Sequence, residues 1–147
     1  MIVFRITTAQ WSNSLNASGY SARWNSRGNM LIYTAESRSL ACLENIVHRS
    51  GEGNNALYKV MLIELPATLT IETLDVASLS DDWYTTDNYR YCQEIGNKWL
   101  NDQRFAVLKV PSVIIKKENN YLINPHHPDF KKIKLLGNED FDFDKRF

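Results

Sequence analysis

Alternating apolar and polar positions predict strands along most of the chain. Prolines close two of them, since Pro66 follows one apolar run and Pro111 another. A proline-bounded turn, NPHHPDF, follows a third. The segments predicted as strands are 1–6, 30–33, 57–65, 68–74, 105–110, a short stretch within 119–124, 130–136 and, as a final edge strand, 139–147.

Helical spacing appears first after residue 36. Leu40, Leu43 and Val47 recur three or four residues apart, which predicts one apolar helix face. Ser37 is suited to cap the start of this helix, and Ser50-Gly51 is suited to end it.

A second helical stripe lies near the middle of the chain. Tyr91, Cys92, Ile95 and Trp99 fall on one face, and Gly96 lies within it. A glycine inside a helix costs about 1 kcal/mol relative to alanine. Its presence here indicates close packing against a neighbour.

The balance of elements favours an α+β fold in one domain over residues 1–147. Strands outnumber helices and alternate with them irregularly, which argues against a doubly wound parallel sheet. We therefore expect mixed or antiparallel sheets with few helices. A chain of 147 residues is long enough to bury a core without metals or disulfides.

Composition and charge exclude several classes of protein. Residues are 44% hydrophobic and 23% charged, and no apolar run is long enough for a membrane span. The N-terminus reads as a strand rather than a secretion signal, so we expect a cytoplasmic protein. Lys plus Arg equals Asp plus Glu at 17 each, without the basic excess typical of nucleic-acid binding. Any contact with DNA is therefore expected to be indirect, through a partner.

Two arginines and a tyrosine are candidates for ligand binding. Arg23 lies in a polar loop, where its guanidinium could hold a phosphate or carboxylate, or could stack on Trp24 at the surface. Arg5 offers the same choice, with a structural ion pair as the default. Tyr33, at the end of a strand, could offer its ring to a planar heterocycle or belong to the core.

Glu44 and Ser112 are candidates for chemistry. Glu44 lies at the margin of the first helix's apolar stripe, where a carboxylate is partly desolvated and acts strongly on a nearby cation. The alternative is a Glu that points to solvent or pairs locally. Ser112, at a strand end, could bond a substrate hydroxyl or make a turn, and no Gly-x-Ser-x-Gly motif marks it as a nucleophile.

The remaining polar residues indicate no metal or familiar nucleotide motif. His126 and His127 are adjacent, so we do not expect them to converge on a metal, although Asn124 and His126 could border a pocket. Cys42 and Cys92 lack C-x-x-C spacing and read as packing residues. The chain has neither a P-loop nor a Rossmann glycine fingerprint.

Taken together, these motifs resemble the RES-domain toxin family. The resemblance runs in order along almost the whole chain, on Arg23-Trp24-Asn25, Gly28, Tyr33-Thr34-Ala35, Glu44, His48, Ile95-Gly96, Trp99, Val110-Pro111-Ser112, Asn120-Tyr121, Asn124-Pro125, His127 and Phe143-Asp144-Lys145-Arg146. The arginine, glutamate and serine that name the family fall on Arg23, Glu44 and Ser112.

The resemblance implies a fold similar to ADP-ribosyltransferases and a toxin that acts on NAD. It implies cleavage of the nicotinamide–ribose bond, with NAD as substrate and no permanently bound cofactor. Glu44, Arg23 and Ser112 would be catalytic, and NAD would be bound by Arg5, Arg23, Asn25, Tyr33, Ser112 and Asn124. The implied partner is an Xre-type antitoxin that binds DNA. Independently of the resemblance, exposed strand edges could pair two copies of the chain into a homodimer.

The sequence is also compatible with two alternatives. One is transfer of ADP-ribose to a host protein. The other is a binding module without catalysis, in which Glu44 and Arg23 form only an internal ion pair.

Overall fold

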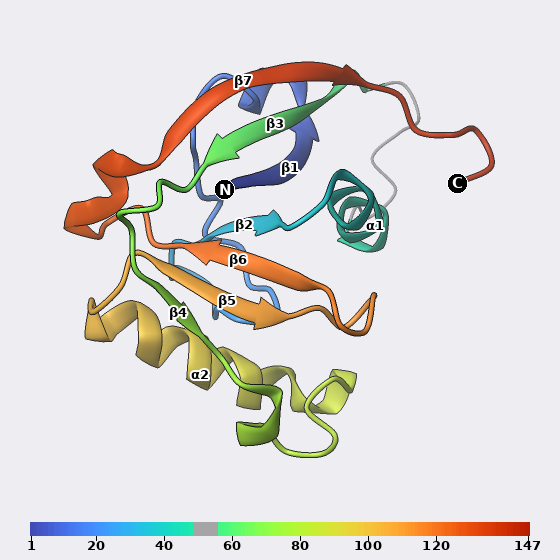
Figure 1. Ribbon diagram of the computed structural model, residues 1–147. Coiled ribbons are helices and arrows are strands. Elements are labelled where there is room, and N and C mark those ends of the chain that lie inside the picture. The colour runs from blue at the N-terminus through green and yellow to red at the C-terminus, as the bar shows by residue number, and fades with distance from the viewer. Residues whose placement is uncertain (49–55) are drawn as a thin grey trace.

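Seven strands of the described part of the chain form one mixed sheet (Figure 1). The computed structural model describes residues 1–48 and 56–147. The α+β prediction with few helices is confirmed, with one sheet rather than several. Its strands, in the order in which they lie side by side, are β4 (Ile71–Thr73), β5 (Val107–Pro111), β6 (Asn119–Ile123), β2 (Ile32–Ala35), β1 (Ile2–Thr8), β3 (Tyr58–Glu64) and β7 (Lys134–Phe141).

One parallel pair decides where the longer helix lies. β4 and β5 run parallel, whereas the other neighbouring strands described are antiparallel. Parallel neighbours need a long crossover connection. Here it contains two short 3-10 turns, η2 (Val76–Ser78) and η3 (Thr86–Asn88), and the helix α2 (Tyr89–Asp102).

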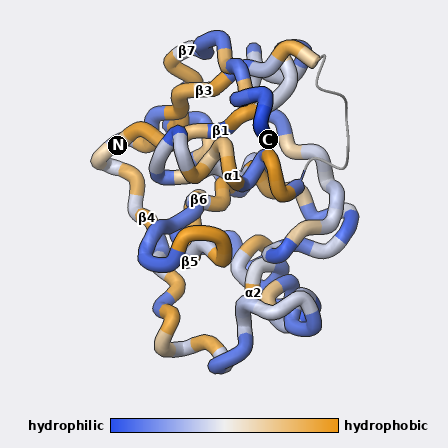
Figure 2. The backbone as a smooth tube through the Cα atoms, turned by 90° about the vertical axis from the view of Figure 1, so that its right-hand side faces the viewer, coloured by the Kyte–Doolittle hydropathy of each residue, from blue (hydrophilic) through white to orange (hydrophobic). Residues whose placement is uncertain are grey.

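The helix α1 (Arg38–His48) and α2 cover the same face of the sheet. Tyr33 packs with the α2 cluster, and Ala35, two residues along β2, packs with the α1 cluster. Because side chains alternate along a strand, these two residues share a face. The other face holds a separate apolar cluster around Val3, Ile32 and Met61. In Figure 2 apolar positions concentrate in strands such as β3 and β5, whereas α2 mixes polar and apolar positions.

The start of α1 follows the prediction, but its buried stripe is shorter than predicted. The Leu40 amide donates to the Ser37 hydroxyl at 3.1 Å, which confirms Ser37 as the cap. Leu40 is fully buried, whereas Val47 is 62% exposed. The predicted stop at Ser50-Gly51 lies outside the described residues.

The stripe on α2 is confirmed, and its glycine has a packing reason. Cys92, Trp99 and Leu100 are buried with Gly96 in the interface. A Cβ atom on Gly96 would lie 1.8 Å from the carbonyl oxygen of Trp24. The helix can therefore lie against the backbone of the Trp24 loop only because this position has no side chain.

Several predicted strand boundaries were wrong. The strand predicted over 30–33 lies at Ile32–Ala35, and that over 68–74 is reduced to Ile71–Thr73, because a turn bonds the Leu69 amide to the Pro66 carbonyl. The segments 130–136 and 139–147 are not two strands. A 3-10 turn, η4 (Pro128–Lys132), precedes the single edge strand β7, because Pro128 starts the turn and the His127 ring caps it.

In the two described ranges, no helix combines the length and the apolar character needed to cross a membrane.

We predict that Gly96→Ala destabilises the protein by about 3 kcal/mol or more, since the new methyl group meets backbone that cannot move aside locally. Urea unfolding measures the loss. Glu94→Ala on the exposed side of α2 is the matched control and should change stability by less than about 0.5 kcal/mol. Equal stability of the Gly96 variant and the wild type would contradict the packing argument.

Candidate functional site

A cavity of about 450 Å³ opens on the face of the sheet that carries both helices. Its lining includes Arg5 from β1, Arg23 from the loop between β1 and β2, Tyr33 from β2, and Glu44 and His48 from α1. This volume is within the range of small-molecule sites. Four of the predicted site residues thus meet in one place although the sequence separates them by up to 39 positions.

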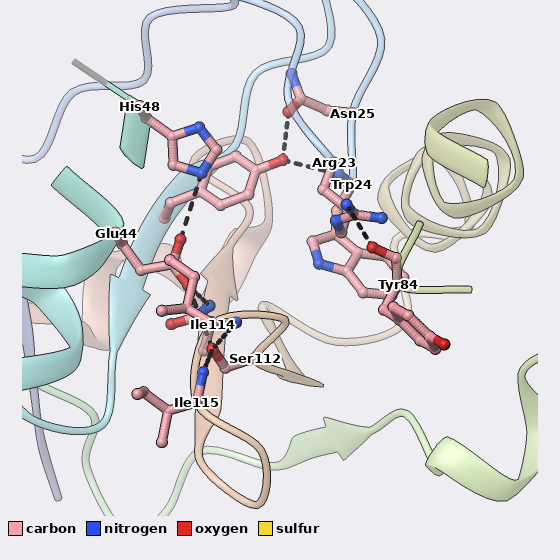
Figure 3. Close-up of polar contacts among 11 residues, drawn as sticks. Arg23, Trp24, Asn25, Glu44, His48, Tyr84, Ser112, Ile114 and Ile115 are labelled. Atoms are coloured by element: carbon pink, nitrogen blue, oxygen red, sulfur yellow. Dashed lines mark hydrogen bonds and ion pairs between the residues drawn. The ribbon is translucent and has the colours of Figure 1, made fainter. Parts of the chain in front are cut away.

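Glu44 is held at the cavity wall by neutral donors (Figure 3). Its Oε1 atom accepts a bond from the Asn120 amide at 2.7 Å and a longer one from the Ser112 hydroxyl at 3.5 Å. Its Oε2 atom lies 3.3 Å from Nε2 of His48, one turn further along α1. The Glu44 side chain is 24% exposed, so the carboxylate is oriented and partly desolvated while it still borders the cavity.

Ser112 acts on Glu44 rather than facing the cavity as a nucleophile. Its Oγ accepts hydrogen bonds from the backbone amides of Ile114 and Ile115, both at 3.1 Å. A hydroxyl has two acceptor lone pairs and one proton. With both lone pairs used by the turn, the proton is left to donate to Glu44. Ser112 therefore makes a turn, as one reading of the sequence proposed, and also fixes the carboxylate.

Arg23 is anchored by the loop that precedes α2. Its Nη1 atom donates to the Trp83 and Thr85 carbonyls at 3.0 and 3.3 Å, and Nη2 donates to Tyr84 at 3.2 Å. Its guanidinium carbon lies 4.5 Å from the ring centre of Tyr89. The predicted stacking of Arg23 on Trp24 was therefore wrong. Arg23 stacks on Tyr89, and Trp24 is itself buried against Trp83.

The charge of Arg23 nevertheless remains available beside the cavity. The three carbonyl bonds use three of the five N–H groups of the guanidinium. Neutral carbonyls also leave its positive charge in place, whereas a carboxylate partner would neutralise it. Glu44 and Arg23 do not bond to each other, since each is held by its own partners.

Tyr33 is fixed through its hydroxyl. The hydroxyl donates a hydrogen bond to Oδ1 of Asn25 and accepts one from the Trp24 amide at 3.1 Å. Burial is the main cause that raises the pKa of Tyr33, and the nearby Tyr89 and Glu44 add to the effect. The phenol therefore stays neutral at physiological pH, and its ring forms part of the cavity wall.

Asn25 supports the site from behind. Its side chain is 1% exposed, and its amide nitrogen donates to the carbonyls of Tyr20 and Asn29, both at 2.9 Å. It thus closes the loop around itself and positions Tyr33. It does so through hydrogen bonds inside the loop, outside the cavity lining.

Arg5 has a backbone partner where an ion pair was the default expectation. Its Nη1 atom donates to the Asn16 carbonyl at 2.6 Å. Burial lowers the pKa of the Arg5 guanidinium. A cation that is desolvated and held by a neutral carbonyl is suited to attract an anionic group of a ligand.

Asn124 lies away from the other candidates. It follows the end of β6, four residues from Asn120, and is fully buried. Its Oδ1 accepts a hydrogen bond from the His126 amide at 2.9 Å, and its backbone amide donates to the Ala106 carbonyl. It shapes the turn after β6, and the structure does not bring it to the cavity.

Sequence reasoning did not select two residues of the site. His48 is four positions after Glu44, a spacing that places both on one helix face and could have drawn attention to it. Asn120, like His48, stands among the residues that carry the family resemblance, but no local spacing links it to Glu44, because β6 meets β2 only in the folded sheet. A third neighbour, Tyr89, became visible only when the crossover folded over the sheet.

The arrangement places opposite charges around a partly dry space. Glu44 supplies a carboxylate on the α1 side and Arg23 supplies a guanidinium group, and Arg5 is a further lining residue. Within the described ranges, no three His, Cys, Asp or Glu side chains gather as a metal site. Such a cavity suits a ligand with anionic groups and with a centre that becomes positive during reaction.

Comparison with known proteins identifies relatives over nearly the full length. The model of the RES domain family matches residues 2–144. A protein of Sphingobium sp. (strain YBL2) named Prs ADP-ribosylating toxin is 36% identical, with 88% of this chain and 89% of the relative covered. A protein of Photorhabdus laumondii named Toxin Res is 34% identical, with coverage of 99% and 96%.

A solved structure shares the fold. The crystal structure of the M.tuberculosis MbcT-MbcA toxin-antitoxin complex contains a chain that aligns with a TM-score of 0.77. The alignment covers 96% of this chain and 84% of that one at 18% sequence identity. The fold is therefore shared although few side chains are.

We predict that Tyr33→Phe costs about 2 kcal/mol of stability, because it leaves a buried acceptor on Asn25 and the Trp24 amide without their partner. Urea unfolding at neutral pH measures the loss. Tyr20→Phe, at a residue that is 75% exposed, is the control and should change stability by less than about 0.5 kcal/mol.

The contribution of Tyr33 to stability should depend on pH. Because folding raises the pKa of Tyr33, its contribution is fully present below the ordinary tyrosine value of about 10 and is lost as pH rises through the folded value. The unfolding free energy of the wild type should therefore fall more steeply above about pH 10 than that of the Tyr33→Phe protein. Parallel curves would contradict the assignment.

Proposed function

This chain belongs to the RES domain family, and from that premise we propose that it is a bacterial toxin that degrades NAD by breaking the nicotinamide–ribose bond. Relatives that match nearly its full length carry toxin names, which supports its assignment as a toxin. The observation that carries the reaction is the carboxylate of Glu44, oriented by neutral donors at the wall of the cavity.

The chemistry requires an anion at this place. When the bond between nicotinamide and ribose breaks, its electron pair goes to the ring nitrogen and positive charge develops on the ribose. A fixed carboxylate in a partly dry site stabilises that charge better than water does, because it needs no reorganisation. Water or phosphate then attacks the ribose carbon and loses a proton.

The other residues fit the remaining groups of NAD. Arg5 and Arg23 provide positive charge for the two phosphates, and Tyr33 provides a ring for the planar nicotinamide. Ser112 and Asn25 serve indirectly, by holding Glu44 and Tyr33 in place. NAD enters this scheme as substrate rather than as a resident cofactor.

We predict that induction of the wild type alone in bacteria depletes cellular NAD and arrests growth, and that Glu44→Gln does neither. Glutamine keeps the size of the side chain but removes its charge, so the loss of NAD cleavage should exceed about 100-fold while the melting temperature stays close to that of the wild type. Enzymatic assay of NAD and thermal unfolding make the two measurements. Retained depletion by the variant would refute the role of Glu44.

The runner-up is transfer of ADP-ribose to a host protein. It is favoured by the name of the Sphingobium relative, an ADP-ribosylating toxin. NAD labelled in its adenine half separates the two reactions, because cleavage leaves the label in small molecules whereas transfer attaches it to protein. No growth arrest on expression of the chain alone, with neither NAD loss nor protein labelling, would point to the binding-module alternative.

A toxin of this kind needs a restraining partner, and we propose an Xre-type antitoxin. The fold relative comes from a toxin-antitoxin complex, which supports the kind of partner. DNA binding then belongs to the antitoxin, in keeping with the balanced charge of this chain. Both proteins would act in the cytoplasm, where NAD is available. Co-purification of the two chains, with light scattering to count copies and detect a toxin homodimer, checks this proposal.

A further inference from the structure

Asn120 makes the shorter of the two neutral hydrogen bonds to Glu44. It lies on β6 and borders the cavity, and its amide nitrogen is 2.7 Å from Oε1 of Glu44. The bond from Ser112 to the same oxygen is 3.5 Å, near the limit for a hydrogen bond. The orientation of the carboxylate therefore depends more on Asn120 than on Ser112.

The other end of the Asn120 side chain is left unsatisfied. Its Oδ1 atom is buried and has no hydrogen-bond partner within the described ranges. A buried acceptor without a partner destabilises a protein, and asparagine is also a poor strand residue. A leucine here would avoid both costs but would lose the bond to Glu44, so what distinguishes the asparagine is that bond.

The chemistry of the amide explains its presence. An amide N–H donates to a carboxylate without neutralising it, whereas Lys or Arg at the same place would cancel much of its charge. One oxygen of Glu44 is thereby fixed and its negative charge is kept. We propose that Asn120 is the positioning residue that holds Glu44 for the reaction, an inference that rests on the proposed cleavage of NAD.

A matched pair of variants separates positioning from packing. Asn120→Leu should lower kcat for NAD consumption by about tenfold or more, with KM changed less than about threefold, as expected for loss of an orienting partner. Its melting temperature should stay close to that of the wild type, because removal of the unsatisfied acceptor offsets loss of the bond to Glu44. A purely structural residue would show the reverse pattern.

Asn119 supplies the control on the same strand. Its amide nitrogen donates to Oε2 of Glu36 at 3.1 Å, so it makes a similar bond to a carboxylate outside the cavity lining. Asn119→Leu should leave kcat within about threefold of the wild type. Wild-type kcat in Asn120→Leu, or equal loss in both variants, would overturn the proposal.

Asn120→Asp adds a readout in pH. The new carboxyl would lie within hydrogen-bond distance of Glu44, and two close carboxylates tend to share a proton. The acid side of the kcat profile should move to higher pH by about one unit. The other titratable groups that border this cavity are Arg5, Tyr20, Arg23, Tyr33, His48 and Tyr89, and they are the same in both proteins. An unmoved profile would contradict the contact.

NMR tests the contact without relying on catalysis. The side-chain amide protons of Asn120 should shift with pH as Glu44 takes up a proton, and this shift should be absent in Glu44→Gln. No pH-dependent shift in the wild type would overturn the positioning role. If the shift is present but the wild type consumes no NAD, the contact stands and the proposed function is what fails.

Discussion

The close contact between α2 and the loop that carries Arg23 and Trp24 is the constraint on which the site depends. Gly96 lets the helix lie directly against the backbone of Trp24. That approach leaves the Trp24 amide directed at the Tyr33 hydroxyl and leaves Arg23 beside the carbonyls that precede α2. The parallel pairing of β4 with β5 supplies the crossover that brings α2 to this face. Sheet topology and one missing side chain thus build one wall of the cavity together.

The opposite wall depends on hydrogen bonds rather than on packing. Glu44 projects from α1, and its partners come from β6 and from the turn after β5. Both of these donors are neutral, so they orient the carboxylate without neutralising it, while its Oε2 atom lies 3.3 Å from Nε2 of His48. Arg23 is held in the same way by backbone carbonyls. The anion and the cation therefore keep their charges in one partly desolvated space, where electrostatic effects on a ligand are stronger than in water.

This separation of charges bears on the choice between the functional classes. In a binding module stabilised by an internal ion pair, Glu44 and Arg23 would contact each other. Instead Arg23 is held by backbone carbonyls, Glu44 is held by Asn120, Ser112 and His48, and both residues line the cavity. An unsatisfied acceptor on Asn120 beside the carboxylate is a further cost that a purely structural role would not explain. The geometry favours a site that acts on a substrate over an internal ion pair.

The sequence by itself determined the fold class, most strands, both helices and the core of the site. Local patterns were sufficient for these, because periodicity, the Ser37 cap and the exceptional glycine in α2 are properties of neighbouring residues. Arg23, Tyr33 and Glu44 were also identifiable, through the order of motifs along the chain. Only the tertiary structure decided that Asn120 contacts Glu44, that Arg23 stacks on Tyr89 and that Asn124 lies elsewhere. Those facts depend on strand register and on the crossover, which join residues far apart in the chain and leave no periodic trace in it.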